Sequence, residues 1–115
     1  MKKFSFMLLL LSSFSLSACH STYATIENRS TEPLDAMRLT LTEDPEIVIR
    51  LPSLSPEKSL RKVLPSGFGE SSLIFEATAG SSELSVNCGY LESDGLYRAR
   101  IQVQPDLTAT CEIDI

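Results

Sequence analysis

The chain has 115 residues, 43% of them hydrophobic, and a formal net charge of −5. This length sets a limit of one domain, which excludes a second domain and a nucleotide-binding fold. The acidic balance excludes a nucleic-acid binder, because phosphate contacts require clustered cations and no basic run is longer than two residues, as in Arg61-Lys62.

Residues 1–18 have the layout of a helical secretory signal peptide. Lys2 and Lys3 form its positive end, and an apolar run with one interruption follows from Phe4 to Leu11. Leu16-Ser17-Ala18-Cys19 comes next and resembles the lipobox of bacterial lipoproteins. The resemblance implies cleavage before Cys19, a diacylglycerol thioether on its sulfur, and acylation of the new N-terminus, commonly with palmitate.

Two other interpretations of this segment are less favoured. A membrane-spanning helix needs about 20 apolar residues, and serines interrupt the run well before that length. An ordinary signal peptide would leave Cys19 as an incidental residue. The chain holds only Cys19, Cys88 and Cys111, and an odd cysteine in an exported protein needs an explanation. Lipidation of Cys19 supplies one and leaves an even pair.

The lipobox also predicts where the mature protein lies. Removal of the two N-terminal lysines changes the formal charge from −5 to −7, so an anionic lipid surface would repel the domain unless acyl chains held it. His20, rather than Asp, follows Cys19, which by resemblance to enterobacterial sorting implies the periplasmic face of the outer membrane. The tether, residues 19–22, spans roughly 10 to 14 Å when extended. The domain of residues 23–115 is therefore expected close to its membrane.

Apolar and polar residues alternate through most of the mature chain, which is typical of half-buried strands. We expect strands at 23–28, 37–42, 46–51, 72–78, 83–90, 96–104 and 109–115. Turn signals separate them at Glu43-Asp44-Pro45, at residues 79–82, at Asp94-Gly95 and at Pro105-Asp106. The pattern predicts an all-β fold: a small antiparallel β-sandwich of seven or eight short strands, Ig-like in the broad sense, or alternatively a small β-barrel.

The alternation also predicts which side chains face the core. They are Met37, Leu39 and Leu41; Ile47, Ile49 and Leu51; Leu73, Phe75 and Ala77; Leu84, Val86, Cys88 and Tyr90; Tyr97, Ala99, Ile101 and Val103; and Ala109, Cys111, Ile113 and Ile115.

The secondary structure of residues 55–64 is ambiguous. Ser55 and Pro56 could begin a short helix, whereas prolines at both borders suit an edge strand over 59–64. We favour the strand because its neighbours are strands.

Cys88 and Cys111 lie on the core faces of their predicted strands. Export to an oxidising compartment favours a disulfide between them, which would stabilise the fold by roughly 3.4 kcal/mol. Two buried free thiols are the alternative. In a simple meander over residues 83–115 the outer strands would lie about 9 to 10 Å apart, too far for a bridge. The two strands must therefore pair directly or face each other across a sandwich.

The sequence offers little catalytic chemistry. The only histidine is His20, beside the lipidated residue. The rest of the chain therefore lacks the imidazole that a Ser-His-Asp or Cys-His arrangement needs, and it lacks a Cys/His cluster that could bind zinc. Three acidic groups, Glu43-Asp44-Glu46, Glu92 with Asp94, and Glu112 with Asp114, fit solvated positions better than an acid–base pair or a calcium loop. We therefore expect no catalytic residue, no metal and no cofactor, and a protein that is not an enzyme.

Several residues are candidates for binding. Phe68 lies between two glycines in a predicted loop and is the best single candidate for contact with a partner; the alternative is a ring folded back over the end of the domain. Val48, Ile74 and Leu96 are expected to point outward and could form a second apolar patch. Arg98 and Arg100 are expected to pair across strands with Glu83, Glu112 or Asp114.

The function that fits these expectations is a membrane-anchored, non-catalytic envelope lipoprotein that binds another envelope protein. A small inhibitor or immunity lipoprotein directed against a hydrolase is the alternative. If the strands run alternately up and down, the 43–45 turn lies near the membrane and the loops 28–33 and 51–55 point away from it. A protein partner is expected at those loops or on a face of a sheet.

Overall fold

The structure, a computed structural model, describes residues 21–65, 67–92 and 95–114. The expected signal peptide, the lipidation residue Cys19, His20 and the terminal Ile115 lie outside the described residues, as does Asp94 of the predicted Asp94-Gly95 turn. The described part covers the end of the expected tether and almost all of the expected β domain.

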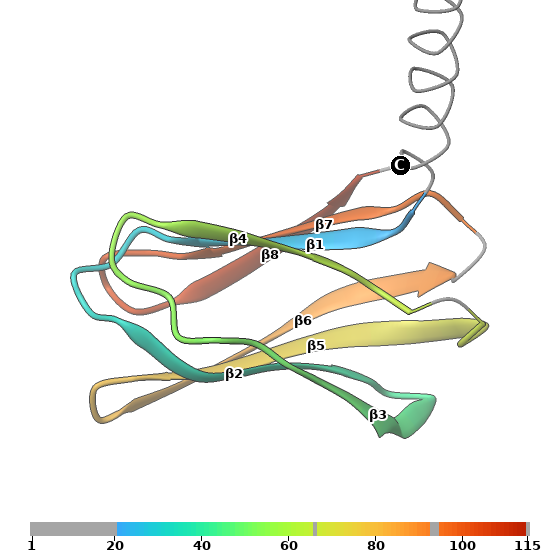
Figure 1. Cartoon of the computed structure of the whole chain (residues 1–115), viewed down its shortest axis with the longest axis horizontal. Coiled ribbons are helices and arrows are strands. Elements are labelled where there is room, and N and C mark those ends of the chain that lie inside the picture. Colours follow the sequence, from blue (N-terminus) through green and yellow to red (C-terminus); the bar gives the residue numbers. More distant parts are fainter. Residues whose placement is uncertain (1–20, 66, 93–94, 115) are drawn as a thin grey trace, which may run out of the picture.

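The described residues form eight strands in two packed sheets (Figure 1). The strands are β1 (Tyr23–Asn28), β2 (Leu34–Leu41), β3 (Asp44–Arg50), β4 (Ser59–Val63), β5 (Glu70–Ala79), β6 (Ser82–Glu92), β7 (Arg98–Val103) and β8 (Ala109–Asp114). The first sheet has the order β4-β1-β7-β8 and the second the order β3-β2-β5-β6. Paired strands are antiparallel except β1 and β7, which run parallel. The predicted β-sandwich is confirmed, and the alternative of a barrel is wrong because the sheets remain separate.

Alternate residues of both sheets fill the space between them, as the period-two pattern predicted. In β5 every second residue from Ser71 to Ala79 is buried, and β1 alternates in the same way. The largest fully buried apolar side chains are Phe75, Ile26, Leu34, Met37, Leu39, Leu41, Leu73, Leu91, Ile101 and Val103. Burial of this apolar surface holds the two sheets together.

Tyr90 is the exception among the predicted core residues that the structure describes, and a β-bulge is the reason. Its side chain is 53% exposed, whereas Leu91 is fully buried. The register with β5 shifts beside Cys88, which becomes an extra residue in β6. An extra residue moves the following side chains to the opposite face of the sheet. Gly89 takes the positive φ of 100° at this bulge without steric cost.

Residues 59–63 form the edge strand β4, which pairs with β1. The strand interpretation of residues 55–64 is therefore confirmed. Several predicted strand boundaries differ from the observed ones by one to three residues. The first hairpin turns at Thr42-Glu43, which places Pro45 within β3. A proline is tolerated there because β3 is an edge strand with one unpaired side. Residues 96 and 97 precede β7 instead of belonging to it.

The predicted disulfide between Cys88 and Cys111 is present, with 5.0 Å between the two Cα atoms. Cys88 lies in β6 and Cys111 in β8, the edge strands of different sheets. Of the two arrangements that the sequence left open, the bridge across the sandwich is correct. It ties the sheets together along one side of the molecule.

The sandwich has two ends, which we call basal and distal. At the basal end the chain enters β1 at Tyr23, beside the end of β4 at Val63 and the start of β7 at Arg98. The β2–β3 turn, the β4–β5 loop and the β6–β7 connection lie at this end as well (Figure 1). The distal end carries residues 29–33, 51–58, 80–81 and 104–108. The expected loops 28–33 and 51–55 therefore do lie opposite the point where the chain enters.

Candidate functional site

The distal end is organised by Asn28, the last residue of β1, which is 1% exposed. Its Nδ2 donates hydrogen bonds to the backbone oxygens of Glu32 at 2.8 Å and Leu54 at 3.0 Å. Its Oδ1 accepts hydrogen bonds from the backbone N–H of Ser30 at 3.0 Å and from the Ser30 hydroxyl at 2.7 Å. The amide therefore uses its full hydrogen-bonding capacity inside the protein.

The backbone of Asn28 joins a further segment to this cluster. Its N–H donates to the carbonyl of Lys58 at 3.0 Å, and its carbonyl accepts from the N–H of Glu57 at 2.8 Å. Leu34 and Leu54 exchange two backbone hydrogen bonds of 2.9 Å. The loops 29–33 and 51–58 are thus held in one arrangement, as a recognition surface on a rigid scaffold requires.

A hollow of about 340 Å³ opens beside this cluster. It is lined by Glu27, Asn28, Arg29, Glu57, Lys58 and Ser59. Carboxylates and cations both border it, so it suits a polar surface with charges of both signs better than an apolar ligand. Glu57 has a φ of 63°, a strained conformation for a residue other than glycine, and its hydrogen bond to Asn28 holds it there.

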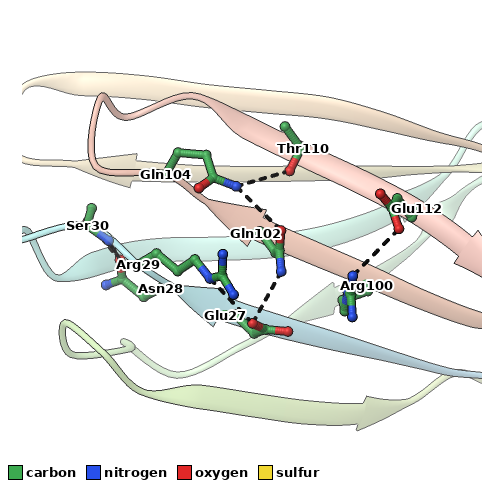
Figure 2. Close-up of polar contacts among 9 residues, drawn as sticks. All are labelled: Glu27, Asn28, Arg29, Ser30, Arg100, Gln102, Gln104, Thr110 and Glu112. Atoms are coloured by element: carbon green, nitrogen blue, oxygen red, sulfur yellow. Dashed lines mark hydrogen bonds and ion pairs between the residues drawn. The ribbon is translucent and has the colours of Figure 1, made fainter.

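The outer face of the first sheet continues the polar surface from this hollow (Figure 2). The Glu27 carboxylate lies 3.7 Å from Arg29 Nε and accepts a hydrogen bond of 3.4 Å from Gln102 Nε2. Gln104 Nε2 lies 3.4 Å from both Gln102 Oε1 and Thr110 Oγ1. These contacts are long and partly exposed, so another protein can replace them with its own hydrogen bonds.

The predicted cross-strand pairing of the β7 arginines is found at Arg100. Its Nη2 lies 3.6 Å from Glu112 Oε2, because the register places the two residues opposite each other on β7 and β8 (Figure 2). Arg98 lies opposite Asp114 in the same register. The basic residues of this strand are thus placed against acidic residues of its neighbour.

Phe68 does not serve as an exposed contact residue, and that prediction is wrong. Its side chain is 6% exposed and belongs to the core at the basal end. Gly67 and Gly69 have φ values of +83° and +74°, which only glycine adopts readily, and the loop turns the ring inward between them. The alternative interpretation, a ring folded back over the end of the sandwich, is correct.

The predicted apolar patch is divided. Val48 and Ile74 share the outer face of the second sheet, since both lie opposite Thr40 in β2. Leu96 lies in the β6–β7 connection at the basal end, away from them. Val48 and Leu96 are exposed, whereas Ile74 is half-buried.

The second sheet also carries an open groove of about 460 Å³ toward the distal end. The groove is lined by Ala36, Arg38, Glu76, Ala77, Thr78, Glu83, Leu84 and Ser85. Arg38 donates two hydrogen bonds of 3.1 Å to the Glu76 carboxylate across it. This pairing lowers the pKa of Glu76 and raises that of Arg38. Because the pair satisfies both charges, we place the candidate site at the distal loops and not here.

At the basal end, Thr22 is built into the fold. Its carbonyl accepts a hydrogen bond from the N–H of Leu64 at 2.9 Å, and its hydroxyl donates to the carbonyl of Gly95 at 2.7 Å. Thr22 is buried, whereas Ser21 is exposed. The expected tether of residues 19–22 is therefore shortened by one residue, because its last member belongs to the domain.

Metal-ligating side chains do not converge in the described part of the chain: no group of three or more His, Cys, Asp or Glu residues there could hold an ion. Besides Arg38 and Glu76, two further groups have shifted pKa values. Hydrogen bonds from the hydroxyl and N–H of Thr108 lower the pKa of Asp106, and a hydrogen bond to Glu70 raises that of Tyr90.

No helix among residues 21–65, 67–92 and 95–114 has the length and apolarity to cross a bilayer.

Sequence reasoning missed the role of Asn28, which looked like the polar end of a strand. A local signal does exist. An asparagine followed two residues later by serine can form a turn in which the side-chain oxygen accepts the backbone N–H of the serine. The two bonds from Nδ2 to Glu32 and Leu54 depend on the packing of separate loops, so no local pattern indicates them.

Comparison with known proteins adds information on the fold. No protein-family model and no curated protein matches the chain. Among solved structures, the NMR structure of a protein from Eubacterium rectale is similar, with a TM-score of 0.56 and 11% sequence identity over 84% of this chain and 88% of that chain. At this level of identity the likeness shows a shared β-sandwich architecture alone.

Proposed function

We propose that this protein is a lipid-anchored, non-catalytic envelope lipoprotein that binds another envelope protein through its distal end. The anchor is the acylated Cys19 of the lipobox-like segment, on the periplasmic face of the outer membrane. The observation that carries the proposal is the placement of two surfaces: the chain enters at one end, and the loops that Asn28 orders lie at the other.

Three features support this arrangement. A disulfide between Cys88 and Cys111 suits an oxidising compartment outside the cytoplasm. The distal loops are fixed by buried hydrogen bonds before any partner arrives, which lowers the entropy lost on binding. The surface around the 340 Å³ hollow and the adjoining sheet face is polar, as is common in interfaces between proteins that also exist apart.

The experiment uses the full-length chain expressed in a bacterium with an outer membrane. A photo-crosslinking amino acid replaces Lys58 at the distal hollow in one variant and Ser85 on the second sheet in a matched control. We expect one stoichiometric envelope protein to be crosslinked from position 58 and not from position 85. Mass spectrometry of the mature chain reports acylation of Cys19.

Each other outcome would overturn part of the proposal. An unacylated Cys19 contradicts the lipid anchor. Crosslinking of the envelope partner from position 85 alone contradicts the distal site. If the crosslinked protein is a hydrolase from outside the cell, and its activity falls on binding, the inhibitor or immunity function replaces the proposed one.

A further inference from the structure

Exposed apolar side chains gather at the basal end. Among the described residues, the exposed large hydrophobic side chains are Val48, Val63, Tyr90 and Leu96, and all except Val48 lie at this end. Val63 and Leu96 are 55% and 50% exposed. Solvent-exposed apolar groups concentrated at one end of a domain indicate a contact surface.

Val63 and Leu96 stand on either side of the point where the chain enters. Thr22 accepts the N–H of Leu64, the residue after Val63, and donates to the carbonyl of Gly95, the residue before Leu96. These hydrogen bonds place both exposed side chains beside Thr22, at the start of the domain. Whatever holds the N-terminal segment therefore lies next to them.

Cations accompany these side chains on the first sheet. Arg61 lies over the ring of Tyr23, with its guanidinium carbon 4.4 Å from the ring centroid. Lys62 and Arg98 are exposed on β4 and β7, the two strands that flank β1. Of the acidic residues nearby, Asp114 lies opposite Arg98, and Glu112 is paired with Arg100. The basal residues on the first sheet thus carry a net positive charge, although the whole chain is acidic.

The second sheet has the opposite charge at the same end. Its basal residues include the exposed or half-buried carboxylates Glu43, Asp44, Glu46, Glu70 and Glu92. An anionic surface would attract the first sheet and repel the second. The basal end is therefore asymmetric, and a membrane can meet it in one favoured orientation.

We infer that a basal corner, formed by Tyr23, Arg61, Lys62, Val63, Leu96 and Arg98, rests against lipid headgroups as a second membrane contact beside the acyl chains. The inference rests on the proposed lipid anchor. The three peptide units from Cys19 to Thr22 reach roughly 10 Å at most, so the corner must lie at the headgroup region. Aromatic and aliphatic side chains mixed with cations are the composition that this region favours.

This contact fixes how the domain stands on the membrane. The first sheet leans toward the lipid, while the acidic basal residues of the second sheet and the distal loops point into the periplasm. Without the corner, a domain of such negative charge on a short tether would turn freely and be repelled from anionic lipid. The corner thus sets the direction in which the distal loops are presented.

The chain contains no tryptophan, so one substitution introduces a single fluorophore. Leu96→Trp and Val63→Trp report on the corner, and Val48→Trp is the matched control because Val48 is also exposed but lies in β3. The acylated full-length protein is placed in vesicles of phosphatidylethanolamine and phosphatidylglycerol (3:1) with brominated acyl chains. We expect bromine quenching at positions 63 and 96 to exceed that at position 48 by about fivefold or more, because bromine quenches over a short range and only the corner lies in the lipid interface.

Charge reversal provides a second measurement. The variant R61E/K62E/R98E, built on Leu96→Trp, should lose at least half of its quenching in these vesicles. A matched variant with the same change of charge at the distal end and on β3, R29E/R50E/K58E, should keep it. Equal loss in both variants would show that net charge alone acts and would overturn the role of the corner.

The outcomes separate this inference from the proposed function. Failure of every variant to float with the vesicles overturns the lipid anchor. Flotation with equally weak quenching at positions 48, 63 and 96 leaves the anchor intact and overturns the corner contact. Stronger quenching at position 48 than at 63 or 96 also overturns it, because the second sheet would then face the lipid.

Discussion

The two ends of the sandwich are closed by different physical means. At the distal end, the buried amide of Asn28 holds separate loops through directional hydrogen bonds. At the basal end, Phe68, Leu64 and Leu91 cover the core through apolar contact, and separate hydrogen bonds of Thr22 and Ser71 join the segments around it. The distal loops therefore converge on one buried amide, whereas the basal end combines an apolar cover with separate hydrogen bonds and leaves Val63 and Leu96 exposed.

The largest effect is expected from a change that should weaken both ends alike. In the double variant C88A/C111A the link between β6 and β8 is lost, and the unfolded chain gains conformational freedom. We expect the free energy of unfolding to fall by roughly 3.4 kcal/mol. Urea denaturation measures this loss, and hydrogen exchange should show similar loss of protection at the two ends. A loss confined to one end would contradict a bridge that ties the whole sandwich.

A cavity at the basal end should act more locally. Phe68→Ala removes a buried ring, and we expect a loss of about 3 kcal/mol, at the lower end for such changes because the glycine-flanked loop can partly close over the space. Phe68→Leu, the matched control, should lose less than half as much. Thermal unfolding gives both values. If Phe68→Ala were as stable as the wild type, the ring would not close this end.

Asn28→Ala tests the distal end by removing the hub of its hydrogen bonds. The carbonyls of Glu32 and Leu54 each lose one of two hydrogen bonds, the N–H of Ser30 loses its acceptor, and we expect a loss of about 2 kcal/mol. Hydrogen exchange should rise in loops 29–33 and 51–58 but stay unchanged at the basal end. Thr31→Ala, an exposed change in the same loop, should have little effect. An equal rise in hydrogen exchange at both ends would contradict a local role of Asn28.

The smallest effects are expected on the pH dependence of stability: the distal end should lose stability in acid and the basal end in alkali. Thr108 lowers the pKa of Asp106 at the distal end, so that contribution is present above the unfolded pKa of about 3.9 and is lost as acid protonates the carboxylate. Glu70 raises the pKa of Tyr90 at the basal end, so that contribution is present below the unfolded pKa of about 10 and is lost as alkali ionises the phenol.

Side-chain NMR titration should therefore find Asp106 titrating below its ordinary range and Tyr90 above its own. Asp106→Asn should abolish the loss of stability of the 105–108 turn in acid and leave the stability of the basal end unchanged. The variant Glu70→Gln should return the pKa of Tyr90 toward its ordinary value. Unshifted titration of either residue would contradict the hydrogen bond assigned to it.

Much of the fold could be predicted from local pattern. Alternation and turn residues alone predict the strand at 23–28, a strand at 83–90 that the structure extends to 82–92, and the hairpin turn within residues 79–82. The outward turn of Tyr90 could not be predicted, because a bulge at Cys88 changes the face of every later residue in the strand. Phe68 was misplaced for a related reason: a loop between glycines can turn either way, and only the open end of the core draws the ring inward.

The candidate site was predictable in its location but not in its structure. The strand count and the up-and-down order placed loops 28–33 and 51–55 opposite the chain entrance. That Asn28 joins them depends on Leu54 and Lys58, which lie 26 and 30 residues away in the chain. Contacts of this kind arise only when distant segments pack, so composition and period carry no sign of them.

The all-β class, most residues of the core and the pairing of Cys88 with Cys111 could be inferred from the sequence alone, since these depend on local alternation and on counting cysteines. The tertiary structure decided how the strands are divided between two sheets and that the disulfide crosses between them. It also places Val63 and Leu96 on either side of Thr22. The physical reason is that alternation fixes which face of a strand is apolar, whereas pairing between distant strands fixes which faces and ends come together.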